Sequence, residues 1–242
     1  MRSAGTGTLR LALLQVRDDP RAEAQEREAF AAVGGLLPEQ IRSWNLVSRP
    51  AIGIADLAGC DAVVIGGAGA HSVTEDDPFT APLLDLVGEL VARRRPVFGS
   101  CYGHQFLARA LGGRVVTDPE HSELGTFELH LTAVGAADPW LAGLPPSFDA
   151  QFGHNDWVVE LPPGAVELAY TARCRHQAFR IGELPVYGAQ FHVELDEARM
   201  LARAALYRDA YLPASDAMKR LADSLRPSPV AATLFARFLA LV

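Results

Sequence analysis

A cysteine lies between two glycines in the segment "GSCYG" (99–103), after an apolar run and before a helix-like stretch. This spacing suits a sharp strand-to-helix turn, because a Cβ atom at either glycine would collide with the strained backbone. The positive end of a helix dipole favours the thiolate of Cys101 over the thiol. The N–H of Tyr102 would point toward a carbonyl under attack. Taken alone, the pattern is equally typical of a small buried cysteine at a turn.

A catalytic cysteine needs a base, and the chain has seven histidines. The best placed is His192, which follows the apolar run "VYGAQF" (186–191) and has Glu194 two residues later. Residues i and i+2 of an extended backbone face the same side, so Glu194 can orient the imidazole toward Cys101. Without Cys101, a strand-end histidine beside a solvated glutamate is the simpler interpretation.

An attacked carbonyl also needs hydrogen-bond donors for its developing oxyanion. The glycine-rich segment "GGAGAHSV" (66–73) follows an apolar run, and a backbone N–H near Gly67 could approach a ligand closely. The segment matches neither the phosphate-binding nor the dinucleotide-binding glycine pattern. The open alternative is a plain glycine turn at the end of a strand.

The elements that must position these residues follow from the hydrophobic pattern. Strand-like and helix-like runs alternate up to residue 113, which predicts right-handed βαβ units around a parallel sheet. The strands are expected at 9–16, 61–67 and 96–98, and the helices at 20–37, 82–94 and 102–111. Short β-like runs from 114 to 191 predict strands that extend the sheet or form a smaller antiparallel layer. Helices are expected again at 196–211, 215–225 and 228–242.

The composition limits the classes of partner. Hydrophobic residues make up 49% of the 242 residues and charged residues 21%, which is typical of a globular protein. The net charge of −7 argues against nucleic acid or an anionic membrane as the main partner. No apolar run approaches the ~20 residues of a membrane span. Arg10 interrupts the first apolar run, so no signal peptide is expected, and three cysteines indicate a reducing cytoplasm.

Other polar clusters favour structural interpretations. His71 and the acidic residues at 75–77 lack regular metal-ligand spacing, so we expect a solvated loop at the mouth of the site and no bound metal. Cys174 and His176 lack the partner cysteines of a zinc site. The arginines at 93–95 are expected to end a helix.

Two segments together resemble the class I glutamine amidotransferase family. "PVFGSCYGHQFLARALGG" (96–113) is similar to the nucleophile region of that family, and "YGAQFHVE" (187–194) is similar to its His/Glu region. The segments 66–73, 122–125 and 153–171 match in the same order, so the resemblance spans roughly residues 9–200. It implies an α/β fold with a flavodoxin-like, mostly parallel sheet flanked by helices, added antiparallel strands and a C-terminal helical extension. We expect residues 1–200 to form the catalytic domain and 201–242 to be an extension packed on it.

The resemblance also implies roles for individual residues. Cys101 would be the nucleophile, His192 the base and Glu194 its orienter, with oxyanion donors at Gly67 and Tyr102. The γ-glutamyl end of a substrate would contact four further residues: Gln105, His154, Asn155 and Asp156. Attack on glutamine would release ammonia and leave a γ-glutamyl thioester, a reaction that requires no cofactor.

The sequence departs from the family pattern at two places. Val193 stands where the family usually has proline between the histidine and the glutamate, and we expect extended geometry to survive this change. The segment 66–72 lacks the proline that often follows the paired glycines, which predicts a less rigid loop.

The acceptor of ammonia is expected on another chain, because no ATP-binding motif follows residue 200. This favours a glutaminase whose partner is a separate synthetase chain. The alternative is a stand-alone γ-glutamyl peptidase or hydrolase. A catalytically silent binding module is less favoured, since Cys101, His192 and Glu194 are all present. The apolar segment "AATLFARFLALV" (231–242) is expected to cover the protein's own core rather than dock a partner.

Overall fold

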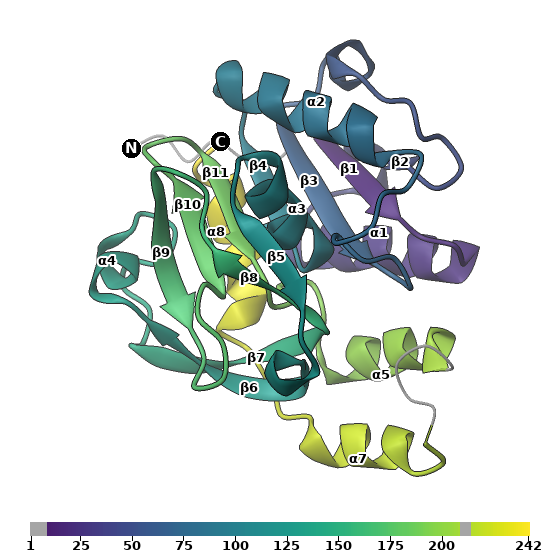
Figure 1. The fold of residues 1–242 in the computed structure, drawn as a ribbon, viewed down its shortest axis with the longest axis vertical. Helices are drawn as coiled ribbons and strands as arrows, with labels where there is room; N and C mark the ends of the chain where they lie inside the picture. Colours follow the sequence, from purple (N-terminus) through teal and green to yellow (C-terminus); the bar gives the residue numbers. More distant parts are fainter. Residues whose placement is uncertain (1–8, 209–213) are drawn as a thin grey trace.

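A nine-stranded sheet forms the centre of the molecule in a computed structural model that describes residues 9–208 and 214–242 (Figure 1). The strand order is β2-β1-β3-β4-β11-β10-β9-β6-β7, and β5 and β8 form a separate two-stranded sheet. The strands are β1 (Leu11–Val16), β2 (Ile41–Asn45), β3 (Ala62–Ala68), β4 (Val97–Ser100), β5 (Arg114–Thr117), β6 (Glu123–Leu131), β7 (Ser147–His154), β8 (Asp156–Glu160), β9 (Ala165–Tyr170), β10 (Ala178–Ile181) and β11 (Val186–Ala189).

The strands β2, β1, β3, β4 and β11 run parallel, and their side chains alternate between two apolar layers. Leu11 and Leu13 of β1 face α1 (Pro20–Gly34) and α8 (Leu234–Leu239). Ala12 and Leu14 face α2 (Thr80–Ala92) and α3 (Tyr102–Ala110). The sheet is therefore covered on both faces, as parallel sheets require.

The predicted extra strands take both of the expected forms. β10, β9, β6 and β7 extend the sheet in antiparallel pairing beyond β11. β5 and β8 pair antiparallel as a small layer beside α3 (Figure 1). The expected α/β class and mixed sheet are confirmed.

Two details of the sequence prediction were wrong. The first helix ends at Gly34 rather than near residue 37, because Gly35 adopts a left-handed conformation and its N–H caps the carbonyls of Ala31 and Ala32. The strand β2 was not predicted; it lies at the edge of the sheet, and only Ile41 and Trp44 of its five residues are buried.

The C-terminal residues pack on the core. Phe235 and Phe238 of α8 contact Phe98 of β4, and Trp140 Nε1 donates to the carbonyl of Leu234. The apolar segment 231–242 therefore covers the protein's own core, as expected. The helix expected at 196–211 is α5 (Glu197–Leu206), and residues 209–211 of that prediction lie outside the described residues. The helix expected at 215–225 is α7 (Ala217–Ser224).

Short elements complete the described chain. These are α4 (Ala133–Ala137) and 3-10 turns at Pro38–Gln40, Ile54–Leu57, Pro119–His121 and Ala231–Thr233. Within residues 9–208 and 214–242, none of the helices has the length and apolar character needed to cross a bilayer.

Candidate active site

Cys101 occupies a strained turn between β4 and α3. Its backbone has φ +51° and ψ −100°, a conformation that L side chains rarely adopt. A Cβ atom on Gly103 would lie 2.0 Å from the carbonyl oxygen of Ile65, and one on Gly99 would lie 2.5 Å from the backbone of Gly103. The glycines are therefore required by close backbone approach, as the sequence predicted.

The parallel pairing of β4 with β11 brings His192 to Cys101. Ser100 at the end of β4 is in register with Ala189 at the end of β11, and the N–H of Cys101 donates to the Ala189 carbonyl at 2.8 Å. The carboxyl ends of parallel strands share one edge of a sheet, which is where α/β folds place their sites. The N–H of His192 also donates to the carbonyl of Gln151 in β7 at 2.8 Å. His192 is thus held between the parallel and antiparallel parts of the sheet.

His192 and Glu194 form a buried pair. Nδ1 of His192 lies 2.7 Å from Oε1 of Glu194, and Ser100 Oγ donates to the other oxygen, Oε2, at 3.0 Å. Burial disfavours the imidazolium, but the Glu194 carboxylate and the Cys101 sulfur outweigh it and raise the pKa of His192. Burial likewise disfavours the carboxylate, yet His192 holds the pKa of Glu194 below its usual value. With Val193 between them, the two residues keep the expected geometry.

The second ring nitrogen of His192 and the sulfur of Cys101 both lie against Gly153. A Cβ built on Gly153 would lie 3.9 Å from His192 Nε2, and the Cys101 thiol donates to the Gly153 carbonyl at 3.6 Å. Gln190 Nε2 donates to Cys101 Sγ at 3.7 Å, and its Oε1 accepts from Gln105 Nε2 at 3.0 Å. Sequence reasoning missed Gln190 and Ser100. Their only signal in the sequence is their position, because Ser100 precedes Cys101 and Gln190 lies two residues before His192.

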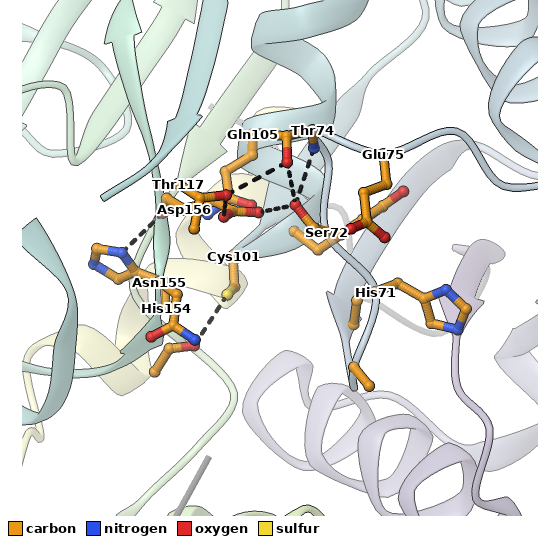
Figure 2. Close-up of a pocket in the computed structure, with 14 residues that line it drawn as sticks. His71, Ser72, Thr74, Glu75, Cys101, Gln105, Thr117, His154, Asn155 and Asp156 are labelled. Carbon is orange, nitrogen blue, oxygen red and sulfur yellow. Dashed lines mark hydrogen bonds between the residues drawn. The ribbon is translucent and has the colours of Figure 1, made fainter. Parts of the chain in front are cut away.

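A cavity of about 260 Å³ opens above Cys101 and is lined by all four predicted substrate residues (Figure 2). Asp156 lies at one side of it, where its carboxylate accepts hydrogen bonds from Ser72 Oγ and Thr117 Oγ1, both at 2.6 Å. Figure 2 shows these three side chains together near Gln105, with Cys101 beside them. The carboxylate is therefore held in place at the wall of the cavity.

The four predicted substrate residues differ in how free their side chains are. Gln105 lines the cavity, but Nε2 also donates to the carbonyl of Asp156 at 2.7 Å. Both ring nitrogens of His154 have acceptors inside the protein, Glu123 Oε2 at 3.0 Å and the Asp156 carbonyl at 2.9 Å. Asn155 is exposed at the wall of the cavity. His154 is thus positioned to fix the wall, while Asn155 and Asp156 present their side chains to it.

The oxyanion prediction for Gly67 does not fit this structure. Its N–H donates to Oε1 of Glu26 at 3.0 Å, so the amide is already occupied by a buried carboxylate. Arg17 Nε and Nη2 donate to the same carboxylate at 3.2 and 2.5 Å, and a Cβ on Gly66 would lie 2.6 Å from it. The paired glycines make room for the Arg17–Glu26 ion pair. A glutamate on the buried face of the helix 20–34 is the sequence signal that could have revealed it.

The loop at residues 70–77 contacts α3 and the residues before α1, while the lower rigidity expected for the segment 66–72 stays a prediction. Arg109 of α3 donates to the carbonyls of Val73 and Glu75 at 2.6 and 3.0 Å. His71 lies between Asp77 at 2.9 Å and Asp18 at 3.2 Å, and it lines the mouth of the cavity. Among the described residues, no group of histidine, cysteine and carboxylate side chains could hold a metal ion.

The comparison with known families matches residues 45–202 to the model of "Glutamine amidotransferase class-I", a range that contains Cys101, His192 and Glu194. The chain belongs to the class I glutamine amidotransferase family. The family membership confirms the resemblance drawn from the sequence.

Similar sequences in the family carry the name GMP synthase (glutamine-hydrolyzing). The protein from Vibrio atlanticus is 34% identical over 139 residues, which are 57% of this chain and 25% of that protein. The chain therefore aligns with about a quarter of it. A smaller relative from Ignicoccus hospitalis, named as one subunit of GMP synthase, is 36% identical over 141 residues, 56% of this chain and 67% of that relative.

Solved structures of the family share the fold. A glutamine amidotransferase from Thermotoga maritima superposes with a TM-score of 0.75 at 21% identity, over 96% of both chains. A putative GMP synthase subunit from Thermoplasma acidophilum has a TM-score of 0.63 at 23% identity, over 84% of this chain and 96% of that one. This likeness confirms the fold of the amidotransferase family for nearly the whole chain.

Proposed function

We propose that this amidotransferase hydrolyses a γ-glutamyl amide through Cys101, with glutamine as the substrate that yields glutamate and ammonia. The observation that carries the proposal is the hydrogen bond between His192 and Glu194 at 2.7 Å, beside a cysteine in a strained strand-to-helix turn. Nucleophile, base and orienter are the three groups that covalent acyl transfer needs.

The reaction divides into two balanced steps. The Cys101 thiolate adds to the γ-carbonyl carbon, the C–N bond breaks, and His192 gives its Nε2 proton to the leaving nitrogen. The product is ammonia and a γ-glutamyl thioester. His192 then takes a proton from water, whose oxygen adds to the thioester carbon and expels the thiolate, releasing glutamate.

The N–H of Tyr102 is the proposed oxyanion donor. Tyr102 is the first residue of α3, so its N–H has no partner within the helix and lies beside the reacting sulfur. A second donor would come from the loop beyond Gly67, where Ala68 and Ala70 line the cavity.

The γ-glutamyl end would bind in the cavity above Cys101. The carboxylate of Asp156, fixed by Ser72 and Thr117, suits the α-ammonium of the substrate. Gln105 and Asn155 would line the same end of the substrate, while His154 holds the wall. The γ-carbonyl then lies at Cys101.

We further propose that the released ammonia passes to a separate synthetase chain. The support is the similarity to a relative that is named as one subunit of GMP synthase.

All three cysteines lie in the described part of the chain and are free thiols, which fits action in the reducing cytoplasm. A stand-alone γ-glutamyl hydrolase is the second candidate, because a second cavity lined by His192 offers space for a leaving group larger than ammonia.

Release of glutamate and ammonia from glutamine tests the proposal directly. The unmodified protein is expected to release both, and C101A neither. C60A is the matched control, because Cys60 is also a buried, free cysteine but lies away from the cavity above Cys101. A chloroketone analogue of glutamine should add one adduct, on Cys101, by mass spectrometry. Absence of the adduct and of turnover on every γ-glutamyl amide would refute the proposal.

A further inference from the structure

A second cavity, lined by His192, lies next to the substrate cavity. Cys101 lines the first cavity and His192 lines the second, while Ala68 and Gly153 line both. The second cavity has a volume of about 40 Å³. Its far wall comes from α5 and the residue after it, through Met200, Arg203 and Tyr207.

Arg203 is the unusual member of this wall, because it is only 6% exposed and its guanidinium is incompletely paired. Nε donates to Gln25 Oε1 at 2.5 Å. Neither Nη1 nor Nη2 has a hydrogen-bond partner in the part of the chain that the structure describes. Buried polar groups normally have hydrogen-bond partners, so we expect these two nitrogens to bind an acceptor.

The two nearby carboxylates do not supply that partner. The closest approach is between Arg203 Nη1 and Glu26 Oε1, at 4.0 Å, and Glu26 already accepts from Arg17, Gln15 and the N–H of Gly67. Glu194 is held by His192 and Ser100. Within residues 9–208 and 214–242, both terminal nitrogens of Arg203 are therefore without a hydrogen-bond partner, and Arg203 lines the cavity.

The electrostatic environment agrees with this geometry. Burial, and then the neighbouring charge of Arg17, lower the pKa of Arg203 to about 10. A guanidinium in this condition is stabilised by an anion, and its planar pair of N–H donors matches a carboxylate.

The position beside His192 assigns the cavity to the leaving group. In the proposed reaction His192 gives a proton to the leaving nitrogen, so whatever that nitrogen carries must lie next to His192. The γ-glutamyl end occupies the other cavity, where Cys101 and Asp156 lie. A substituent on that nitrogen would then extend from His192 toward Arg203, which lines the same cavity.

We propose that Arg203 binds the carboxylate of an amino acid attached to the γ-glutamyl group, so that γ-glutamyl amino acids are substrates of this site. This inference rests on the proposed function and specifies its leaving group. Attack by Cys101 then breaks the bond between the γ-carbonyl and the amino acid nitrogen, and His192 Nε2 protonates that nitrogen. The small cavity favours an amino acid with little or no side chain, such as glycine.

Two substrates of nearly equal size test the inference in the whole chain. γ-Glutamylglycine has the carboxylate, and γ-glutamylglycinamide replaces it with a neutral amide. The unmodified protein is expected to have a kcat/KM at least about 10-fold higher for γ-glutamylglycine, since charge-assisted hydrogen bonds distinguish the two. In R203M, which keeps most of the volume, this ratio is expected to fall to about one.

Arg199 provides the matched control on the same helix. Its Nη1 is paired with Asp196 at 2.7 Å and it does not line the cavity, so R199M is expected to keep the ratio of the unmodified protein. R203K keeps the charge without the planar pair of donors and should give an intermediate ratio. If R203M does not fold, the ratio measured with R203K tests the inference instead.

The outcomes separate this inference from the proposed function. A ratio near one in the unmodified protein, or an unchanged ratio in R203M, overturns the carboxylate subsite while hydrolysis of glutamine stands. No turnover of glutamine or of either dipeptide overturns the proposed function itself.

Discussion

Ser100 Oγ donates a hydrogen bond to Glu194 Oε2 at 3.0 Å, and both residues are completely buried. The bond joins the last residue of β4 to the segment after β11. With His192 on Oε1, each oxygen of the carboxylate has its own donor. The orientation of His192 thus depends on a serine that precedes Cys101 in the chain.

The variant S100A removes this donor and leaves Glu194 Oε2 buried without it. We expect a loss of about 1–3 kcal/mol in the free energy of unfolding. We also expect kcat to fall roughly 3- to 10-fold with little change in KM, because substrate contacts remain. Urea unfolding and steady-state glutaminase kinetics measure the two effects. S48A, at an exposed serine, should change neither, and an S100A protein with unaltered stability and kcat would contradict the role.

The pH profile of E194Q tests the ion pair with His192. The Glu194 carboxylate raises the pKa of His192, so a neutral amide at this position is expected to lower it. As the pH rises, the His192 imidazolium that protonates the leaving nitrogen then loses its proton at a lower pH than in the unmodified protein. The basic limb of the kcat/KM profile should move toward neutral pH, and an unmoved limb would show that Glu194 does not set the titration of His192.

The stability of E194Q should converge on that of the unmodified protein in acid. The pKa of Glu194 lies below its ordinary value of 4.5 in the folded state, so the carboxylate stabilises the fold above that pH. This contribution is lost as the pH falls from about 5 toward the folded pKa. Urea unfolding across this range should show the difference between the two proteins shrinking; a constant difference would disagree with the lowered pKa.

Gln190 is expected to stabilise the thiolate of Cys101. Its Nε2 donates to Sγ at 3.7 Å, and Q190L removes that donor while keeping an apolar side chain of similar size. The rate of alkylation of Cys101 by iodoacetamide at a fixed pH should then fall. Cys60 and Cys174 should react slowly, since burial raises the pKa of both thiols. The same alkylation rate at that pH in Q190L as in the unmodified protein would exclude this contribution.

Substitution by alanine is expected to have opposite effects on stability at Gly103 and at Gly88. In G103A the new Cβ would lie 2.0 Å from the carbonyl oxygen of Ile65, so α3 must move and stability should fall by about 3 kcal/mol. In G88A the new Cβ meets nothing within 4 Å on the exposed face of α2, and stability should rise by about 0.5–1 kcal/mol. Thermal unfolding distinguishes them, and a G103A protein as stable as G88A would argue against the tight packing of the turn.

The alternation of strands and helices up to α3, apart from the strand β2, and the contact between His192 and Glu194 could be predicted from the sequence. Short-range rules are sufficient there: glycines mark the turn, and residues two apart in an extended backbone share a face. The family pattern then links segments that are about 90 residues apart.

Only the tertiary structure decided how the remaining groups are used. The N–H of Gly67 donates to Glu26 of α1, and Arg203 of α5 lines a cavity together with His192. Gly67 and Glu26 are 41 residues apart in the chain. Arg203 reaches its position through the packing of α5. The partners of a buried polar group depend on which helix covers which end of the sheet, and neither local periodicity nor motif spacing specifies that arrangement.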